Sequence, residues 1–222
     1  ARGGALLEEI GCPPLLVSLS HRLKLISDAG VDIACVLNFN KTLAKRSAGD
    51  FVKEILLKKI GAHFIYVGED FKFGKDKKGD AGLLKALGKR YGFLAREVPL
   101  FKVNSAIVIS TAIRRHVAGG RLDEASKLLG RPVSIFGTVV KGSRRGRLLG
   151  YPTANINPHH EAIPPSGVYA VYAVVGARRY KGVLNIGLRP TFEQNQKLAD
   201  IEPTIEAHIC GFSKDIYGKD IV

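Results

Sequence analysis

The chain has 222 residues, enough for one large domain or two smaller ones. Hydrophobic residues make up 45% of the sequence and charged residues 24%, which is typical of a globular protein and excludes a disordered or fibrous chain. The formal net charge is +14, from 34 Lys and Arg against 20 Asp and Glu. This excess favours a polyanionic partner: a nucleic acid, an acidic membrane surface or a nucleotide substrate.

An exported or membrane-spanning protein does not fit this sequence. Its longest apolar runs, such as 168–175, fall far short of the roughly 20 residues of a membrane helix, and no basic-then-apolar leader opens the chain. The three cysteines, Cys12, Cys35 and Cys210, are odd in number and widely spaced, which fits a reducing compartment. We therefore expect a cytoplasmic protein.

Up to Gly130 the pattern alternates between strands and helices. The predicted strands are 31–39, 62–67, 93–98 and 106–109, and the predicted helices are 47–60, 80–92, 110–118 and 122–129. Ser47, Asp80 and Ser110 supply the predicted helix N-caps. This alternation predicts a parallel sheet with crossover helices.

After residue 131 the sequence changes to short β-rich runs between Gly and Pro turns. The predicted strands are 133–140, 168–175, 180–186 and 204–210, and 176–178 joins two of them at hairpin length. This half is predicted to be an antiparallel barrel or sandwich. We place the domain boundary at about residue 130, which gives an α/β domain over 1–130 and a β domain over 131–222.

A basic, glycine-containing segment runs from Lys141 to Asn155. Its glycines let the backbone approach a ligand, and four cations within seven residues suit a polyphosphate, although a bare run of this kind is also typical of a solvated hairpin tip. In an extended chain Thr153 and Asn155 point to the same side and offer two hard oxygen ligands. Such oxygens suit Mg²⁺ held against nucleotide phosphates.

The strand predicted at 204–210 alternates apolar and polar side chains, with Glu206 and His208 on the polar face. Glu206 is then either a solvated surface carboxylate or, beside the basic segment, a base able to accept a hydroxyl proton. His208 is a candidate to orient Glu206, and a plain surface or packing histidine is the alternative. The adjacent His159 and His160 point opposite ways in a strand, so one metal ion is not expected to use both.

Five ordered motifs in this half resemble those of riboflavin kinases: 150–155 (GYPTAN), 167–170 (GVYA), 185–192 (NIGLRPTF), 206–209 (EAHI) and 215–218 (DIYG). The resemblance implies a Greek-key barrel. It also implies that Thr153 and Asn155 contact Mg²⁺ and ATP phosphates and that Glu206 is the base for the riboflavin 5′-hydroxyl. The remaining residues expected at ATP phosphates are Lys141, Gly142, Arg147, Gly150 and Pro152, with Asn185 expected at the flavin or nucleotide.

The first half resembles the adenylyltransferase domain of bacterial bifunctional FAD synthetases, a Rossmann-like nucleotidyltransferase, through 68–75 (GEDFKFGK) and 110–114 (STAIR). Ser110, Thr111 and Arg114 at a helix start fit an anion site for nucleotide phosphates, with a simple N-cap and a surface Arg as the alternative. The residues expected on a loop against nucleotide or flavin are Asp70, Phe71, Phe73 and Gly74. A loop with two buried phenylalanines is the alternative there.

Three departures from the family pattern matter. Ile109 stands where the family usually has a further Ser, and the sequence holds no His-x-Gly-His segment, which His21 and His63 do not replace. The chain also ends before the further strand and helix expected of the kinase. We therefore expect a chain clipped at both ends, with an incomplete adenylylation site.

The sequence as a whole predicts an enzyme of flavin-nucleotide synthesis, which phosphorylates riboflavin to FMN with MgATP and adenylylates FMN to FAD. Its expected partners are these small molecules, with neither nucleic acid nor membrane, and the oligomeric state is left open. One alternative is a basic β-barrel that binds single-stranded nucleic acid. The other is an enzyme with the kinase activity only.

Overall fold

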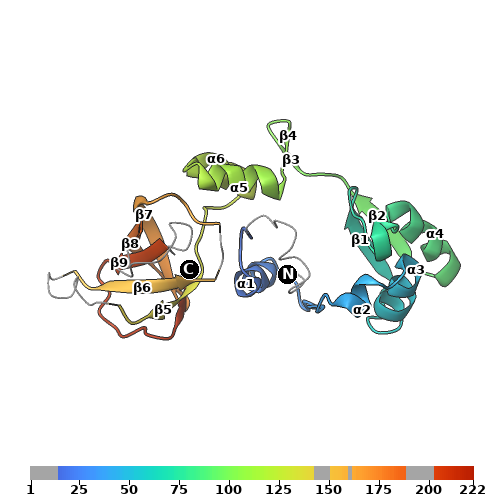
Figure 1. Ribbon diagram of the computed structural model, residues 1–222, viewed down its shortest axis with the longest axis horizontal. Helices are drawn as coiled ribbons and strands as arrows, with labels where there is room; N and C mark the ends of the chain where they lie inside the picture. Colours follow the sequence, from blue (N-terminus) through green and yellow to red (C-terminus); the bar gives the residue numbers. More distant parts are fainter. Residues whose placement is uncertain (1–14, 143–150, 160–161, 189–202) are drawn as a thin grey trace, which may run out of the picture. The chain divides into compact units, whose positions relative to one another are not determined.

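The computed structural model describes residues 15–142, 151–159, 162–188 and 203–222 (Figure 1). The chain divides into two compact units. The N-terminal unit contains Cys35–Val108, and the barrel unit contains Ile109–Val222 together with the described part of Pro13–Ala34. The boundary expected near residue 130 lies inside the barrel unit, between its last helix and its first strand.

The N-terminal unit combines short helices with two small sheets. Its elements are α2 (Lys41–Ala44), α3 (Ala48–Asp50), the π-helix η1 (Phe51–Leu57), β1 (Phe64–Gly68), the 3₁₀-helix η2 (Lys75–Lys77), α4 (Ala81–Tyr91), β2 (Leu94–Val98), β3 (Lys102–Val103) and β4 (Ala106–Ile107). β1 and β2 pair in parallel, with α4 in the connection between them. This β1–α4–β2 crossover confirms the predicted α/β pattern.

Helix α4 begins and ends where its sequence predicts. The side chain of Asp80 accepts the backbone N–H of Leu83 at 2.9 Å, which satisfies one of the unpaired donors of the first turn. At the other end Gly92 adopts the left-handed conformation with φ 79°, which a residue without a β-carbon does at little cost. Cap and stop together fix the position of the helix between the two strands.

The helix predicted over 47–60 is present, but most of it is not an α-helix. Ser47 accepts the backbone N–H of Asp50 at 3.1 Å and donates its hydroxyl to the Asp50 carboxylate at 2.6 Å, so the predicted N-cap is confirmed. From Phe51 the backbone hydrogen bonds join residues five positions apart, as in a π-helix; for example, Lys58 N donates to Lys53 O at 3.1 Å. Spacing of apolar residues does not separate these two helix types, since the buried stripe is similar in both.

The core of this unit lies between η1, α4 and the strands. Its buried side chains are Ala48, Val52, Phe73, Leu84 and Phe93. The opposite face of the β1–β2 pair carries exposed Phe64, Tyr66 and Leu94. Among the described residues of the unit, only one face of the two-stranded sheet is therefore covered.

The strand expected over 31–39 is wrong, and the strand expected over 106–109 has a different partner. Within the described residues, 31–39 pairs with no strand, and its apolar side chains are exposed. An apolar run becomes a strand only where a neighbour takes its backbone N–H and C=O groups. β4 instead turns back on β3 through Asn104 and Ser105, whose positive φ angles fit a tight hairpin.

The described part of the barrel unit has three helices: α1 (Leu19–Asp28), α5 (Ser110–Ala118) and α6 (Leu122–Leu129). α6 ends at Gly130, as predicted, with φ 67°. The prediction that Ser110 caps α5 is wrong, because Ile109 occupies the N-cap and Ser110 is the first helical residue. Within the described ranges, no helix has the length and hydropathy of a membrane span.

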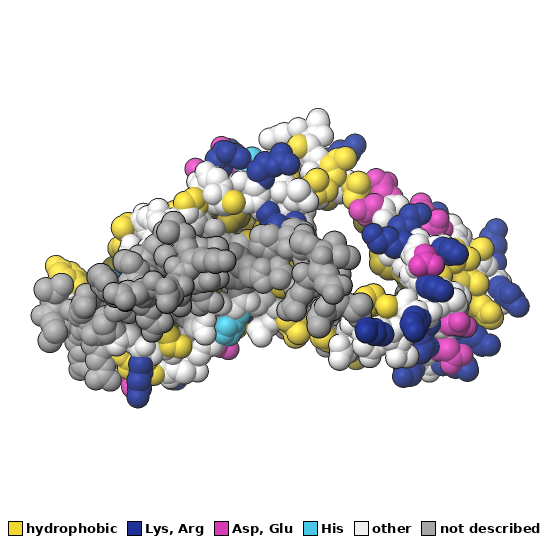
Figure 2. All heavy atoms as spheres, in the orientation of Figure 1, with side chains coloured by type: hydrophobic (Ala, Val, Ile, Leu, Met, Phe, Trp, Pro, Cys, Tyr) yellow, Lys and Arg dark blue, Asp and Glu magenta, His cyan; other side chains and the backbone are white. Residues whose placement is uncertain are grey.

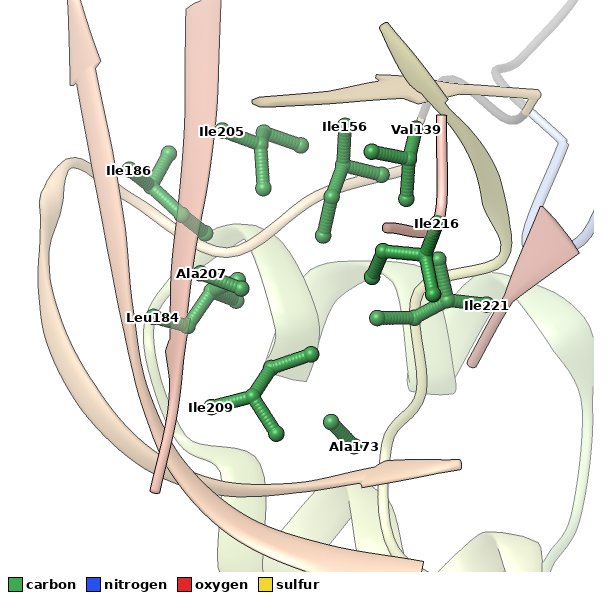
Figure 3. Close-up of a cluster of buried hydrophobic side chains, with 10 residues drawn as sticks. All are labelled: Val139, Ile156, Ala173, Leu184, Ile186, Ile205, Ala207, Ile209, Ile216 and Ile221. Carbon is green, nitrogen blue, oxygen red and sulfur yellow. The ribbon is translucent and has the colours of Figure 1, made fainter. Parts of the chain in front are cut away.

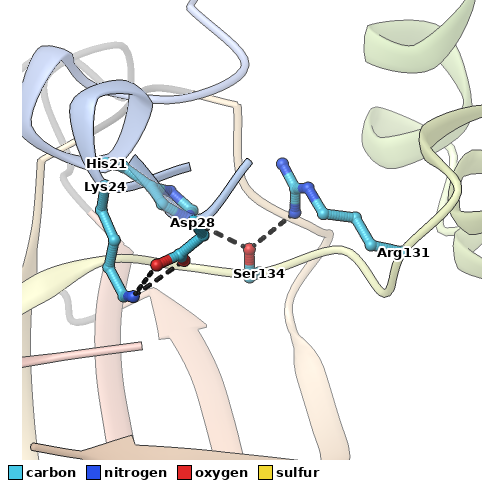
Figure 4. Close-up of polar contacts among 5 residues, drawn as sticks. All are labelled: His21, Lys24, Asp28, Arg131 and Ser134. Atoms are coloured by element: carbon cyan, nitrogen blue, oxygen red, sulfur yellow. Dashed lines mark hydrogen bonds and ion pairs between the residues drawn. The ribbon is translucent and has the colours of Figure 1, made fainter. Parts of the chain in front are cut away.

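Helix α1, which is not among the predicted elements, packs onto the start of the barrel (Figure 4). Ser18 caps it by accepting the His21 N–H. The fully buried His21 ring stacks on Phe136 at 5.5 Å, and its Nε2 lies 3.3 Å from the Ser134 hydroxyl. Arg131 donates to the same hydroxyl at 2.9 Å, and burial lowers the pKa of this guanidinium, which stays charged.

Six strands close an antiparallel barrel in the order β10-β5-β6-β9-β8-β7. They are β5 (Gly137–Val140), β6 (Thr153–Pro158), β7 (Gly167–Val175), β8 (Arg178–Leu188), β9 (Pro203–Ile209) and β10 (Asp220–Ile221). β7, β8 and β9 follow one another as neighbours, while β6 lies beside β9, which is Greek-key connectivity. The Greek-key barrel and the hairpin at Gly176 are confirmed.

The barrel interior is filled by alternate side chains of its strands (Figure 3). They are joined by Ile216 from the loop before β10, and the buried set is Val139, Ile156, Ala173, Leu184, Ile186, Ile205, Ala207, Ile209, Ile216 and Ile221. Because strand side chains alternate, the residues between these core positions point away from the interior. The polar positions of β6, β8 and β9 therefore share the outer face.

Candidate functional site

Two neighbouring strands of the barrel carry the predicted catalytic and metal residues on one face. In the β6–β9 pair Thr153 lies opposite His208 and Asn155 lies opposite Glu206. Their neighbours Ala154 and Ala207 pack in or against the core. The alternation of each strand thus directs hydroxyl, amide, carboxylate and imidazole groups to the same side.

Strand β8 extends this row of polar groups on the other side of β9. Asn185 lies opposite Glu206 in the β8–β9 register, so Glu206 stands between Asn155 and Asn185 on three adjacent strands. Side chains directly opposite each other in an antiparallel pair are about 5 Å apart at their β-carbons. The structure therefore places one carboxylate between two amides, close enough for all three to meet a single ligand.

The start of the basic segment lies against this row. A β-carbon at Gly142 would overlap the side-chain amide of Asn155, so the backbone at Lys141 and Gly142 comes within contact of the predicted metal ligand. This close approach is a physical reason for glycine at 142. Arg147 and Gly150, also expected at phosphate, lie outside the described residues.

His208 contacts the end of the basic segment rather than Glu206. Its Nδ1 lies 2.9 Å from the carbonyl oxygen of Pro152, and the Tyr151 ring meets the imidazole edge-on with centroids 5.7 Å apart. A carbonyl oxygen only accepts, so the Nδ1–H of His208 is the donor. That His208 orients Glu206 stays a prediction, and the hydrogen bond that the structure gives its imidazole is to Pro152.

A cavity of about 500 Å³ opens at Pro152 and Thr153, but Asn155, Glu206 and Asn185 are not among its lining residues. Pro152 and Thr153 lie on one side of it, and the loop of residues 212–217 supplies much of the remaining wall. The loop is held by Asp215, whose carboxylate accepts the Tyr217 N–H at 2.9 Å. The sequence does not reveal that the motif at 215–218 lines this cavity, because its place beside Thr153 depends on the closure of the barrel.

Hard oxygen atoms are the metal donors that this face offers. Among the described residues, no group of three or more His, Cys, Asp or Glu is placed to hold a metal ion. The hydroxyl of Thr153 and the amide oxygen of Asn155 share the face with the Glu206 carboxylate. This donor set suits Mg²⁺ rather than zinc.

The predicted anion site at α5 is present as a helix start. Ser110 and Thr111 are the first two helical residues, whose backbone N–H groups have no partner inside a helix, and Arg114 follows one turn later and is half-buried. A helix N-terminus of this kind favours a negative group. Its role in nucleotide binding stays a prediction.

The loop expected to contact nucleotide or flavin lies in the N-terminal unit. Phe73 is a core residue there and stacks on Phe71 at 5.5 Å, while Asp70 is exposed. Gly74 has φ 72°, and a β-carbon on it would come within 2.6 Å of the Ala48 backbone. Packing accounts for Phe73 and Gly74, which leaves Asp70 and Phe71 as the loop residues open to a ligand.

Two family models divide the chain between them. Residues 129–222 match riboflavin kinase, and residues 5–112 match FAD synthetase. The riboflavin kinase match covers the strands of the barrel, and the FAD synthetase match covers the N-terminal unit and α1. The expected resemblance to both families is confirmed.

The curated relatives agree with this division. A bifunctional riboflavin kinase/FMN adenylyltransferase of Haemophilus influenzae is 36% identical over 208 residues, covering 93% of this chain and 66% of the relative. The corresponding protein of Escherichia coli K12 is 36% identical, with 94% of this chain and 65% of the relative covered. That of Buchnera aphidicola from Acyrthosiphon pisum is also 36% identical, and the match covers 97% and 68%.

The chain belongs to the bifunctional riboflavin kinase/FMN adenylyltransferase family. It spans slightly less than two thirds of the length of the H. influenzae and E. coli relatives. A crystal structure described as a macrolide-efflux protein from Streptococcus pneumoniae is also similar, with a TM-score of 0.73 and 31% identity. That match covers 93% of this chain and 64% of the other.

Proposed function

We propose that the barrel unit transfers a phosphoryl group from ATP to the 5′-hydroxyl of riboflavin and so forms FMN. The observation that carries the proposal is the row in which Glu206 stands between Asn155 and Asn185, with Thr153 on the same face. A match of residues 129–222 to riboflavin kinase supports it.

In the proposed reaction Glu206 accepts the proton of the flavin hydroxyl. The hydroxyl oxygen forms a bond to the γ-phosphorus, the bond from phosphorus to the ADP oxygen breaks, and the proton passes to the carboxylate. Phosphoryl transfer needs mainly positioning and neutralisation of charge. Glu206 is half-buried on the outer face of β9, so its carboxylate can reach a substrate without disturbing the core side of the strand.

Thr153 and Asn155 are the residues that would hold Mg²⁺. Their hydroxyl and amide oxygens are hard donors on the strand next to Glu206, and a magnesium ion bound there would neutralise phosphate charge. The backbone at Gly142 and the Lys141 side chain next to it would meet the phosphates, because Gly142 already contacts Asn155. Arg147, Gly150 and Pro152 remain part of the proposed phosphate site.

For the FAD synthetase part we propose adenylylation of FMN by ATP. The match of residues 5–112 supports this activity. Asp70 and Phe71 are the nucleotide contacts proposed in the N-terminal unit, and Ser110, Thr111 and Arg114 are proposed separately as an anion site at the start of α5. Riboflavin, FMN, FAD and ATP are then substrates or products of one chain.

A nucleic-acid-binding barrel is less well supported. Figure 2 shows Lys and Arg interspersed with Asp and Glu over the N-terminal unit on the visible face, which bears on that unit and not on the barrel. A nucleic-acid groove of that kind combines continuous positive charge with stacking aromatics. Both family models instead describe enzymes.

The test is chromatographic measurement of FMN and FAD formed from riboflavin, ATP and Mg²⁺ by the purified chain. We expect FMN, and we expect Thr153→Val and Asn155→Leu to raise the KM for MgATP by about tenfold or more, the effect of losing one contact to a charged group. Asn157→Leu is the matched control, since Asn157 lies on the same face of β6 opposite Thr138 rather than Glu206. No FMN from the folded chain would overturn the proposal, and wild-type kinetics in both variants would overturn the metal assignment.

A further inference from the structure

His208 makes two contacts with the residues that enter β6. Its Nδ1–H donates to the carbonyl of Pro152 at 2.9 Å, and its ring packs on the edge of Tyr151. Pro152 has no backbone N–H and a fixed φ, so its carbonyl is its only backbone group for hydrogen bonding. His208 therefore binds this residue at the one point that it offers.

This contact fixes the peptide plane in front of Thr153. The carbonyl of Pro152 and the N–H of Thr153 belong to the same planar unit, so a hydrogen bond that holds the oxygen also orients the backbone of Thr153. Thr153 is the partner of His208 in the β6–β9 register. The His208 side chain thus helps to set the orientation of the Thr153 hydroxyl on β6.

The same strand carries Glu206, two residues before His208 on the same face. On its other side β9 is packed closely against β8, where a β-carbon at Gly182 would come within 2.7 Å of the His208 carbonyl oxygen. The backbone of His208 is therefore held on the β8 side while its ring holds the β6 side. Glu206 and Thr153 are thus linked through two residues of β9, the His208 ring and one hydrogen bond to the peptide before Thr153.

We propose that His208 is a positioning residue for phosphoryl transfer, which holds Thr153 in the orientation that MgATP requires relative to Glu206. This inference rests on the kinase function proposed above. It assigns His208 a hydrogen bond and no proton transfer in the reaction, since Nδ1 keeps its proton while it donates to the Pro152 carbonyl.

Three variants separate the hydrogen bond from the ring. His208→Asn keeps a side-chain N–H near the place of Nδ1, His208→Phe keeps the ring beside Tyr151 and loses the donor, and His208→Ala loses both. We expect His208→Phe and His208→Ala to lower kcat/KM for MgATP roughly two- to tenfold, which is the effect of losing one hydrogen bond. His208→Asn should keep most of the wild-type kcat/KM. Riboflavin binding without turnover should stay unchanged in all three.

Two further readouts distinguish positioning from a purely structural or a proton-transfer role. Long-range ¹H–¹⁵N NMR of the whole chain at pH 8 should show the His208 proton on Nδ1 and none on Nε2. If His208 transferred a proton in the reaction, replacing it by an amide, which does not titrate, would remove a midpoint from the pH profile of kcat. We expect the midpoints to stay the same in His208→Asn.

The outcomes separate the two proposals. If the wild-type chain forms no FMN, the kinase function fails, while the NMR result still reports on the Pro152 contact. If the wild type forms FMN and His208→Phe equals it, or His208→Asn is as impaired as His208→Ala, the positioning role is overturned. A proton on Nε2 instead of Nδ1 would overturn it as well.

Discussion

The side-chain amide of Asn155 fills the space that a β-carbon would need at Gly142. Gly142→Ala should therefore push the amide aside, because the far end of a side chain moves more easily than the backbone of β6. Displacing a positioning group by about 1 Å can cost up to a hundredfold in rate, and we expect kcat/KM for MgATP to fall by about ten- to a hundredfold. Kinetics of FMN formation check this.

Gly167→Ala is the control for that change. A β-carbon there would lie 3.6 Å from the Tyr169 ring, which is ordinary contact, and Gly167 also belongs to the barrel. Thermal unfolding should change little in either variant. Normal MgATP kinetics in Gly142→Ala would show that Asn155 does not need its present position.

Arg114 follows the start of α5 by one turn and should serve adenylylation alone. In a chain that makes FAD, Arg114→Ala should impair FAD formation from FMN and leave FMN formation from riboflavin nearly intact, because the proposed kinase residues lie on strands β6, β8 and β9 and not on α5. Arg115→Ala, on the exposed neighbour, is the control. An equal loss of both activities with the fold preserved would contradict separate sites.

Asp80 should make stability depend on acid pH. The Leu83 backbone N–H, and after it Lys72 at 3.2 Å, holds the pKa of this carboxyl below its usual 3.8 in the folded chain. A depressed folded pKa means that its stabilisation is complete above the unfolded value and is lost as pH falls through the folded one.

Denaturant unfolding of the wild type and Asp80→Asn should show this, since asparagine keeps the cap but not the charge. The difference in unfolding midpoint should be constant above about pH 5 and shrink below about pH 4. Lys72→Gln should keep most of the pH dependence, because the Leu83 bond is the larger cause. A difference that persists unchanged at pH 3 would contradict the assignment.

Features set by neighbours in sequence were predictable. Asp80 and Gly92 bound α4 as expected, and the alternation through Ile205, Glu206 and Ala207 predicted which side chains leave the core. Both follow from local rules: a cap within one turn, and the period of two in a strand. The prediction of which residues form the polar face of β9 is therefore confirmed, although it did not depend on knowing the neighbouring strands.

Features that depend on distant partners were not predictable. The contact of His208 with Pro152 joins residues 56 positions apart and exists only because β6 and β9 pair. The run 31–39 has strand composition but no partner among the described strands. α1 was overlooked although Ser18 is a usable N-cap signal, since its only buried residue is His21 rather than an apolar stripe.

Glu206→Gln tests the central claim most directly, because it keeps size and removes the basic oxygen from the row between Asn155 and Asn185. A general base contributes roughly 10²- to 10⁴-fold, and we expect the lower part of that range in kcat because the transition state is largely dissociative. Steady-state FMN formation from riboflavin and MgATP should fall by about a hundredfold, with riboflavin binding unchanged. A Glu206→Gln enzyme that turns over at the wild-type rate would contradict the account and leave Glu206 a solvated strand residue.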